Sequence, residues 1–123
     1  MENKNFDLVV IGSGPAGEKG AAQAAYFGKT VALVEKENVL GGAAANTGTL
    51  PSKTLRESSL YLSGFKQRGL YGISTKLKDQ VTAKDFLYRE RMVVQGERSR
   101  ISDNLEKHKV DVYKGEASFT DGH

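Results

Sequence analysis

A glycine-rich turn near the start of the chain has the residue types and the spacing that bind a phosphate group. It reads Gly12-Ser13-Gly14-Pro15-Ala16-Gly17. Gly12 permits a tight turn, Gly14 lets a phosphate approach the backbone, and Gly17 lets a following helix pack against the preceding strand. Backbone N–H groups and the dipole of a helix that begins here favour a bound anion. We expect five residues to contact nucleotide phosphates: Gly12, Gly14, Pro15, Ala16 and Gly17.

A carboxylate stands where a nucleotide ribose needs a hydrogen-bond acceptor. Glu35 ends an apolar run at residues 30–34. In dinucleotide-binding folds, an acidic residue about 20 residues after the glycine turn accepts hydrogen bonds from a ribose hydroxyl. We expect Glu35 to hold the ribose, with Lys36 beside it in the site. The negative charge of Glu35 disfavours a 2′-phosphate there.

The segments around these residues predict a strand, a helix and a second strand. Residues 6–11 and 30–34 are short apolar runs typical of buried parallel strands. Residues 15–27 open with a proline and predict a slim, alanine-rich helix that Gly28 caps. A βαβ unit of this length has a right-handed crossover. The fold class is therefore α/β, a Rossmann-like domain with a parallel sheet.

The rest of the chain predicts further helices and strands around this unit. Pro51 should interrupt any helix at residues 38–50, and Thr82 and Asp85 have the spacing of a helix start. One face of the helix that follows is apolar and comprises Phe86, Val93, Val94, Ile101 and Leu105. The expected elements are a helix over 52–63, irregular chain over 64–81, a helix to about His108, strands at 110–113 and 117–119, and a hairpin turn at 120–123.

Composition excludes several other classes of function. The chain has 123 residues, is 38% hydrophobic and carries a net charge of +3 with both signs interspersed, which argues against a nucleic-acid partner. It contains no cysteine, so it forms no disulfide and no thiolate metal site. Its two histidines lack metal-ligand spacing, so we expect no metal. Without a signal peptide or an apolar run long enough for a membrane helix, the expected location is cytoplasmic, away from any membrane.

A second motif, at residues 41–53, reads Gly-Gly-Ala-Ala-Ala-Asn-Thr-Gly-Thr-Leu-Pro-Ser-Lys. It resembles the flavin-side motif of the pyridine nucleotide-disulfide oxidoreductases, and the resemblance extends from Asp7 to about Phe119. The two redox cysteines of that family fall here at Ala44 and Thr49. Because thiol–disulfide exchange needs a thiolate, disulfide reductase chemistry is excluded for this sequence.

One branch of the family, the transhydrogenases, does without the disulfide. The run from Gly48 to Arg56 resembles that branch, with Thr49 at the branch's threonine, although Ala44 departs from the cysteine often kept there. The resemblance implies FAD as cofactor, and NADPH and NAD+ as the substrates between which a hydride passes. Lys53 would lie near flavin N5 as a tentative catalytic residue. The resemblance also implies flavin-side contacts at Gly41, Gly42, Ala43 and Ala44, and adenine contacts at Gly115 and Ala117.

Chains of this family are several times longer. We therefore expect residues 1–123 to be the N-terminal part of an FAD-binding domain, without the NAD(P)-binding and dimerisation domains. The full-length protein is expected to be a homo-oligomer. Alone, they should bind FAD weakly and catalyse nothing. Two alternatives stay open: a dihydrolipoyl dehydrogenase-like protein lacking its redox cysteines, and a non-catalytic nucleotide-binding remnant.

Overall fold

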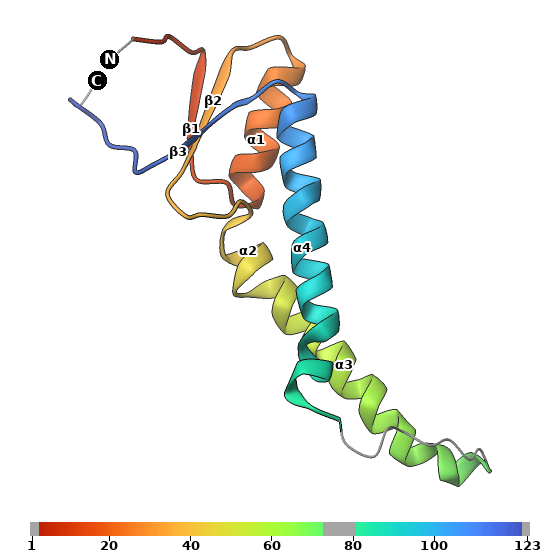
Figure 1. Cartoon of the computed structure of the whole chain (residues 1–123). Helices are drawn as coiled ribbons and strands as arrows, with labels where there is room; N and C mark the ends of the chain where they lie inside the picture. The colour runs from red at the N-terminus through yellow and green to blue at the C-terminus, as the bar shows by residue number, and fades with distance from the viewer. Residues whose placement is uncertain (1–2, 73–80, 122–123) are drawn as a thin grey trace.

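Three parallel strands form the sheet at the centre of the molecule (Figure 1). A computed structural model describes residues 3–72 and 81–121. The strands are β1 (Leu8–Ile11), β2 (Val31–Glu35) and β3 (Asp111–Lys114), and β2 lies between the other two. All their carboxyl ends therefore meet at one edge. The predicted α/β class with a parallel sheet is confirmed.

Two helices cover one face of this sheet and complete the core. Helix α1 (Pro15–Tyr26) connects β1 to β2, and the long α4 (Ala83–Lys107) leads into β3 (Figure 1). The small side chains of α1 allow close packing, and Ala21 is fully buried. The core joins both helices to the sheet and comprises Ala21, Val31, Leu33, Ala45, Ile101, Leu105 and Val110.

The predicted strand β1 is present, but the prediction that it is buried is wrong. Val9 is 54% exposed and Ile11 is 56% exposed, whereas β2 is almost wholly buried. The reason is position, because β1 pairs with β2 on one side only in the described part of the chain. The face of β1 turned away from the helices is not covered by any described element (Figure 1).

The prediction that Pro51 interrupts a helix is also wrong. A short helix α2 spans Gly42–Asn46, and α3 spans Thr49–Gln67 with Pro51 as its third residue. N–H groups in the first turn of a helix have no intrahelical acceptor, so the missing proline N–H costs nothing there. Helix α3 also runs through Gly64, which we expected to be irregular, and the 3₁₀ turn η1 (Arg68–Tyr71) follows. Residues 73–80 of that stretch lie outside the described residues.

Helix α4 begins and ends as predicted. Asp85 donates its backbone N–H to Thr82 Oγ1 over 3.2 Å, and Thr82 donates its own N–H to Asp85 Oδ2 over 3.0 Å, a reciprocal capping box. His108 is the C-cap residue. Of the predicted apolar face, Val94, Ile101 and Leu105 are buried. Residues 116–119 have no regular structure, so the prediction of a strand at 117–119 is wrong. The hairpin turn predicted at 120–123 lies partly outside the described residues.

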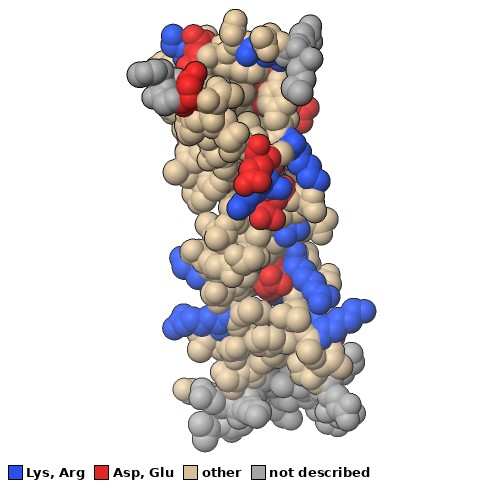
Figure 2. Space-filling view, turned by 90° about the vertical axis from the view of Figure 1, so that its left-hand side faces the viewer, with Lys and Arg blue, Asp and Glu red and all other residues tan. Residues whose placement is uncertain are grey.

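The surface carries charges of both signs. In Figure 2 acidic and basic side chains lie next to one another over the middle of the face shown. Among the described helices, none is long and apolar enough to cross a membrane.

The contact between α1 and β1 allows a matched pair of substitutions. A Cβ at Gly17 would overlap the carbonyl oxygen of Gly12 and approach Val10 Cγ1 to 3.2 Å, whereas a Cβ at Gly20 meets nothing within 4 Å. Gly17→Ala should lower the free energy of unfolding by about 1–3 kcal/mol, the usual cost of overpacking. Gly20→Ala should raise it by about 0.5–1 kcal/mol, because alanine favours a helix interior. Denaturant unfolding followed by circular dichroism measures both. Equal stability of the two variants would contradict the packing role of Gly17.

Candidate functional site

The glycine turn lies at the junction of β1 and α1, as its sequence predicts. Gly12 leaves the strand with a left-handed backbone (φ +93°), and its N–H donates to the Val34 carbonyl oxygen over 2.8 Å. Gly14 is the N-cap of α1, and no side chain of the described residues caps the helix. A Cβ at Gly14 would project into open space. The first turn of α1 therefore presents its N–H groups and the positive end of its dipole to an approaching anion.

A buried serine joins the turn to two other segments. Ser13 is fully buried, and its N–H and hydroxyl both donate to Glu35 Oε2, over 2.9 and 2.5 Å. The N–H of Gly41 donates to Ser13 Oγ over 2.9 Å. The turn, the end of β2 and the second motif therefore meet at one side chain. Nothing in the sequence indicated a role for Ser13, since this position of the glycine pattern accepts any residue.

Hydrogen bonds keep the Glu35 carboxylate ionised. Burial alone would raise its pKa, but the Ser13 hydroxyl and the backbone N–H groups of Glu37, Ser13 and Lys36 outweigh burial and hold the pKa below its ordinary value. The N–H of Glu37 donates to Oε1 over 2.9 Å. Glu35 is thus a fixed, negatively charged acceptor at neutral pH.

Two cavities meet at Glu35 and Lys36, beside the carboxyl ends of the strands. The first measures about 280 Å³, and the second measures about 580 Å³ and includes Gly42 and Ala43. In open α/β sheets, ligands bind outside the carboxyl ends of the strands. Five of the predicted cofactor residues line the first cavity: Gly12, Glu35, Lys36, Gly115 and Ala117.

Other predicted residues lie near this pair of cavities but not in their walls. Pro15, Gly41 and Ala44 line a third cavity of about 340 Å³, together with Thr49. The two motifs touch directly, because a Cβ at Gly42 would lie 3.0 Å from Gly14 Cα. Gly14, Ala16 and Gly17 belong to the turn and the first turn of α1. Lys53 is exposed on α3 and lines none of these three cavities.

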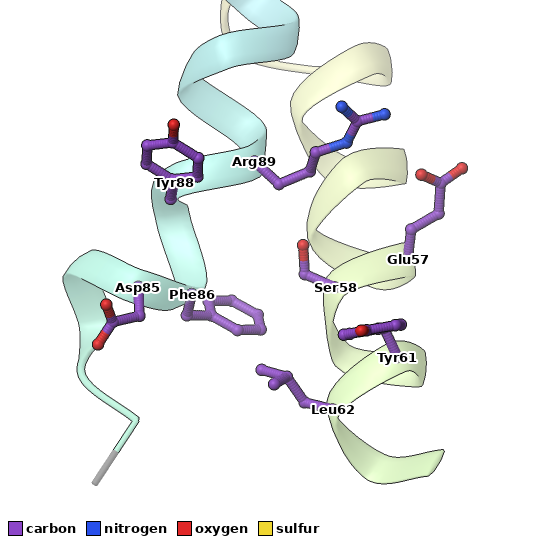
Figure 3. A pocket seen from close by; sticks show the side chains of 8 residues that line it. All are labelled: Glu57, Ser58, Tyr61, Leu62, Asp85, Phe86, Tyr88 and Arg89. Carbon is purple, nitrogen blue, oxygen red and sulfur yellow. The ribbon is translucent and has the colours of Figure 1, made fainter. Parts of the chain in front are cut away.

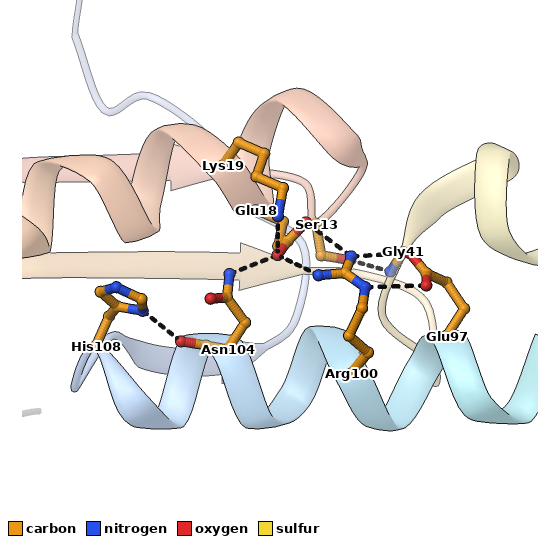
Figure 4. A network of polar contacts seen from close by, with 8 residues as sticks. All are labelled: Ser13, Glu18, Lys19, Gly41, Glu97, Arg100, Asn104 and His108. Carbon is orange, nitrogen blue, oxygen red and sulfur yellow. Dashed lines mark hydrogen bonds and ion pairs between the residues drawn. The ribbon is translucent and has the colours of Figure 1, made fainter.

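A polar network at the third cavity connects α1 to α4 (Figure 4). Glu18 is only 1% exposed, and the two terminal nitrogens of Arg100 donate to its two oxygens over 3.3 and 3.2 Å. Asn104 Nδ2 and Lys19 Nζ also donate to Glu18 Oε1. Burial opposes ionisation of Glu18, but the hydrogen bonds from Arg100, Lys19 and Asn104 hold its pKa below the ordinary value. We did not predict this network from the sequence. The one available signal was a glutamate among the small residues of a helix that packs on the sheet.

A second arginine of α4 lines the 580 Å³ cavity. Arg98 Nε donates to Asn46 Oδ1 over 2.7 Å, and Asn46 Nδ2 donates to the carbonyl oxygens of Leu40 and Gly42 over 2.9 Å each. The partner of Arg98 is thus an amide in the second motif, 52 residues away in the sequence.

A further cavity, of about 420 Å³, lies between α3 and α4 (Figure 3). Phe86 and Leu62 point toward one another there from the two helices. None of the predicted site residues lines it. The described residues also contain no cluster of His, Asp or Glu able to hold a metal ion.

A protein-family model and several curated relatives match this chain. The model of a family described as FAD dependent oxidoreductase matches residues 7–116. The "Soluble pyridine nucleotide transhydrogenase" of Mycobacterium bovis is 48% identical over 120 residues, covering 98% of this chain and 26% of the relative. The protein of the same name from Photorhabdus laumondii is 35% identical over 123 residues, again 26% of its length. The chain thus spans about a quarter of the length of these curated relatives.

The network around Glu18 predicts a defined pH dependence. Because folding lowers the pKa of Glu18, its ionised form stabilises the fold above the ordinary value of 4.5, and this contribution is lost as the pH falls through the lower folded value. Glu18→Gln should therefore lower the free energy of unfolding at neutral pH by about 1–3 kcal/mol. Its stability should also fall less than that of the wild type between about pH 5 and about pH 3.

Denaturant unfolding across this pH range measures the effect. Glu106→Gln, at an exposed carboxylate near the end of α4, serves as the control and should follow the wild-type profile. A Glu18→Gln profile parallel to the wild type would show that Glu18 does not contribute to acid sensitivity.

Proposed function

The chain belongs to the family of FAD-dependent oxidoreductases, and from that premise we propose that residues 1–123 form the N-terminal part of an FAD-binding domain. The complete protein transfers a hydride from NADPH to NAD+ by way of FAD. The curated relatives that carry the transhydrogenase name support this activity, as does the threonine at position 49. The nicotinamide-binding and dimerisation domains belong to the remainder of the complete protein, which is a cytoplasmic homo-oligomer.

The observation that carries the proposal is that the glycine turn begins α1 with no side-chain cap from the described residues and also lines the cavity at Glu35 through Gly12. The diphosphate of FAD lies against the backbone at Gly14, Pro15 and Ala16, where N–H groups and the dipole of α1 favour its charge. The adenosine lies in the 280 Å³ cavity, where Glu35 accepts a ribose hydroxyl and Lys36, Gly115 and Ala117 line the wall. The residues present fit this cofactor, because the open space at Gly14 admits a phosphate that a side chain would exclude.

The flavin half of the cofactor extends from the diphosphate toward the second motif. Gly41, Gly42, Ala43 and Ala44 hold it through their backbone and small side chains. Bound FAD supplies the redox chemistry, as the carrier of the hydride. The family resemblance of the second motif assigns the catalytic role to Lys53, which is exposed on α3 and whose positive charge would stabilise negative charge on the reduced cofactor.

Titration with FAD tests the binding half of the proposal. Gly14→Val should lower the free energy of unfolding by only about 1 kcal/mol, since the added Cβ meets nothing within 4 Å and the remaining cost is that of a less favourable N-cap residue. It should weaken FAD binding about tenfold or more, because it occupies the space of the phosphate. Quenching of flavin fluorescence measures the affinity, and Gly20→Ala is the matched control. Equal FAD affinity of the Gly14→Val variant and the wild type would refute the assignment of the turn.

Hydride transfer from NADPH to a thio-analogue of NAD+ tests the catalytic half in the complete protein. Lys53→Met should lower the turnover rate at least tenfold, while FAD affinity stays within about threefold. Lys53→Arg, which keeps the charge, should retain more of the rate. Residues 1–123 alone should show no turnover. Complete protein that binds FAD but fails to transfer the hydride would refute the activity and leave the binding site intact.

A further inference from the structure

The second motif turns sharply where it approaches the glycine turn. Gly41 and Gly42 both have left-handed backbones, with φ of +104° and +56°. Asn46 Nδ2 donates one hydrogen bond to the carbonyl oxygen of Leu40 and one to that of Gly42. A single side chain therefore bridges the start and the end of the turn.

Arg98 fixes the orientation of that bridging amide. An amide has one acceptor end and one donor end, whereas a guanidinium only donates. Arg98 Nε donates to Asn46 Oδ1 over 2.7 Å, so the NH2 end must face the two carbonyl oxygens. The reversed amide would place NH2 against the guanidinium and an oxygen against the carbonyls, and it would lose all three hydrogen bonds.

The turn that Asn46 bridges is also the contact between the two halves of the proposed site. Gly42 packs against Gly14, close enough that a Cβ at Gly42 would lie 3.0 Å from Gly14 Cα. Arg98 lines the same 580 Å³ cavity as Gly42, Ala43 and Glu35. Helix α4 thus contacts the second motif beside the phosphate turn, although Arg98 lies 52 residues beyond Asn46 in the chain.

We propose that Arg98 is a positioning residue for the flavin half of the cofactor site, and that it acts through Asn46 on the Gly41–Gly42 turn. This inference rests on the proposed function. In this proposal Arg98 affects the cofactor only through that turn. Its loss should therefore weaken binding of a ligand that occupies both halves of the site and spare a ligand that occupies the adenosine half only.

Comparison of FAD with ADP on the complete protein, purified and stripped of flavin, tests this split. Arg98→Met should weaken FAD binding about tenfold, the equivalent of one lost hydrogen bond to a charged group, and change ADP binding less than twofold. Arg91→Met, at an exposed arginine of the same helix, is the control and should leave both affinities unchanged. Flavin fluorescence measures FAD binding, and calorimetry measures ADP binding.

The energetic coupling between Arg98 and Asn46 gives a second readout, which a general loss of stability would not produce. Asn46→Ala should weaken FAD binding at least as much as Arg98→Met, and the double variant no more than Asn46→Ala alone, because both residues act through one contact. Arg98→Lys, which still only donates, should recover part of the affinity. Additive losses in the double variant would overturn the inference.

The remaining outcomes separate this inference from the proposed function. Wild-type protein that binds neither FAD nor ADP overturns the proposed function, and the role of Arg98 with it. Wild-type binding of FAD together with unchanged binding by Arg98→Met overturns the role of Arg98 alone. Equal weakening of FAD and ADP by Arg98→Met also overturns it, since that result indicates a general structural role.

Discussion

The geometry of the candidate site depends on one buried carboxylate. Removing a charge from water is costly unless donors replace the water, and Glu35 obtains those donors from Ser13 and from the backbone beside it. These donors can reach Glu35 only if the glycine turn folds back over the end of β2. Ser13 in turn accepts the N–H of Gly41, which brings the second motif to the same place. Satisfying one charge therefore assembles three segments that lie apart in the sequence.

A second buried carboxylate performs the corresponding task on the other side of α1. Glu18 lies in the first turn of that helix, and its partner Arg100 lies on α4. Its negative charge would disfavour an anion at the nearby helix N-terminus, but Arg100 and Lys19 offset it locally. Two residues earlier on α4, Arg98 reaches Asn46. Helix α4 thus connects to both the first turn of α1 and the second motif without lining the strand-end cavity of about 280 Å³.

Local patterns allowed prediction of the βαβ unit and the start of α4, because their signals lie within a few residues: apolar runs, glycines at fixed offsets, and the reciprocal bonds of Thr82 and Asp85. Predictions that depended on distant neighbours were wrong or missing. The exposure of β1 depends on what packs against it. The error at Pro51 is of another kind, because it concerns where its own helix begins, two residues earlier. Arg100 and Glu18 are 82 residues apart, and no local pattern indicates their contact. The predicted contacts of the site residues with FAD stay predictions, and Lys53 is the one least tied to the cavities.

The absence of thiols is compatible with a flavin site because holding the cofactor and exchanging electrons with a disulfide depend on different atoms. The contacts assigned to the nucleotide are backbone N–H groups, glycine surfaces and the carboxylate of Glu35, and none of them needs sulfur. Ala44 and Thr49, where the disulfide reductases have cysteines, line a separate cavity with Pro15 and Gly41. Small or polar side chains there leave the hydrogen bonds of Ser13, Glu35 and Asn46 unchanged. A sequence can therefore lack disulfide chemistry while keeping every interaction that shapes the nucleotide site.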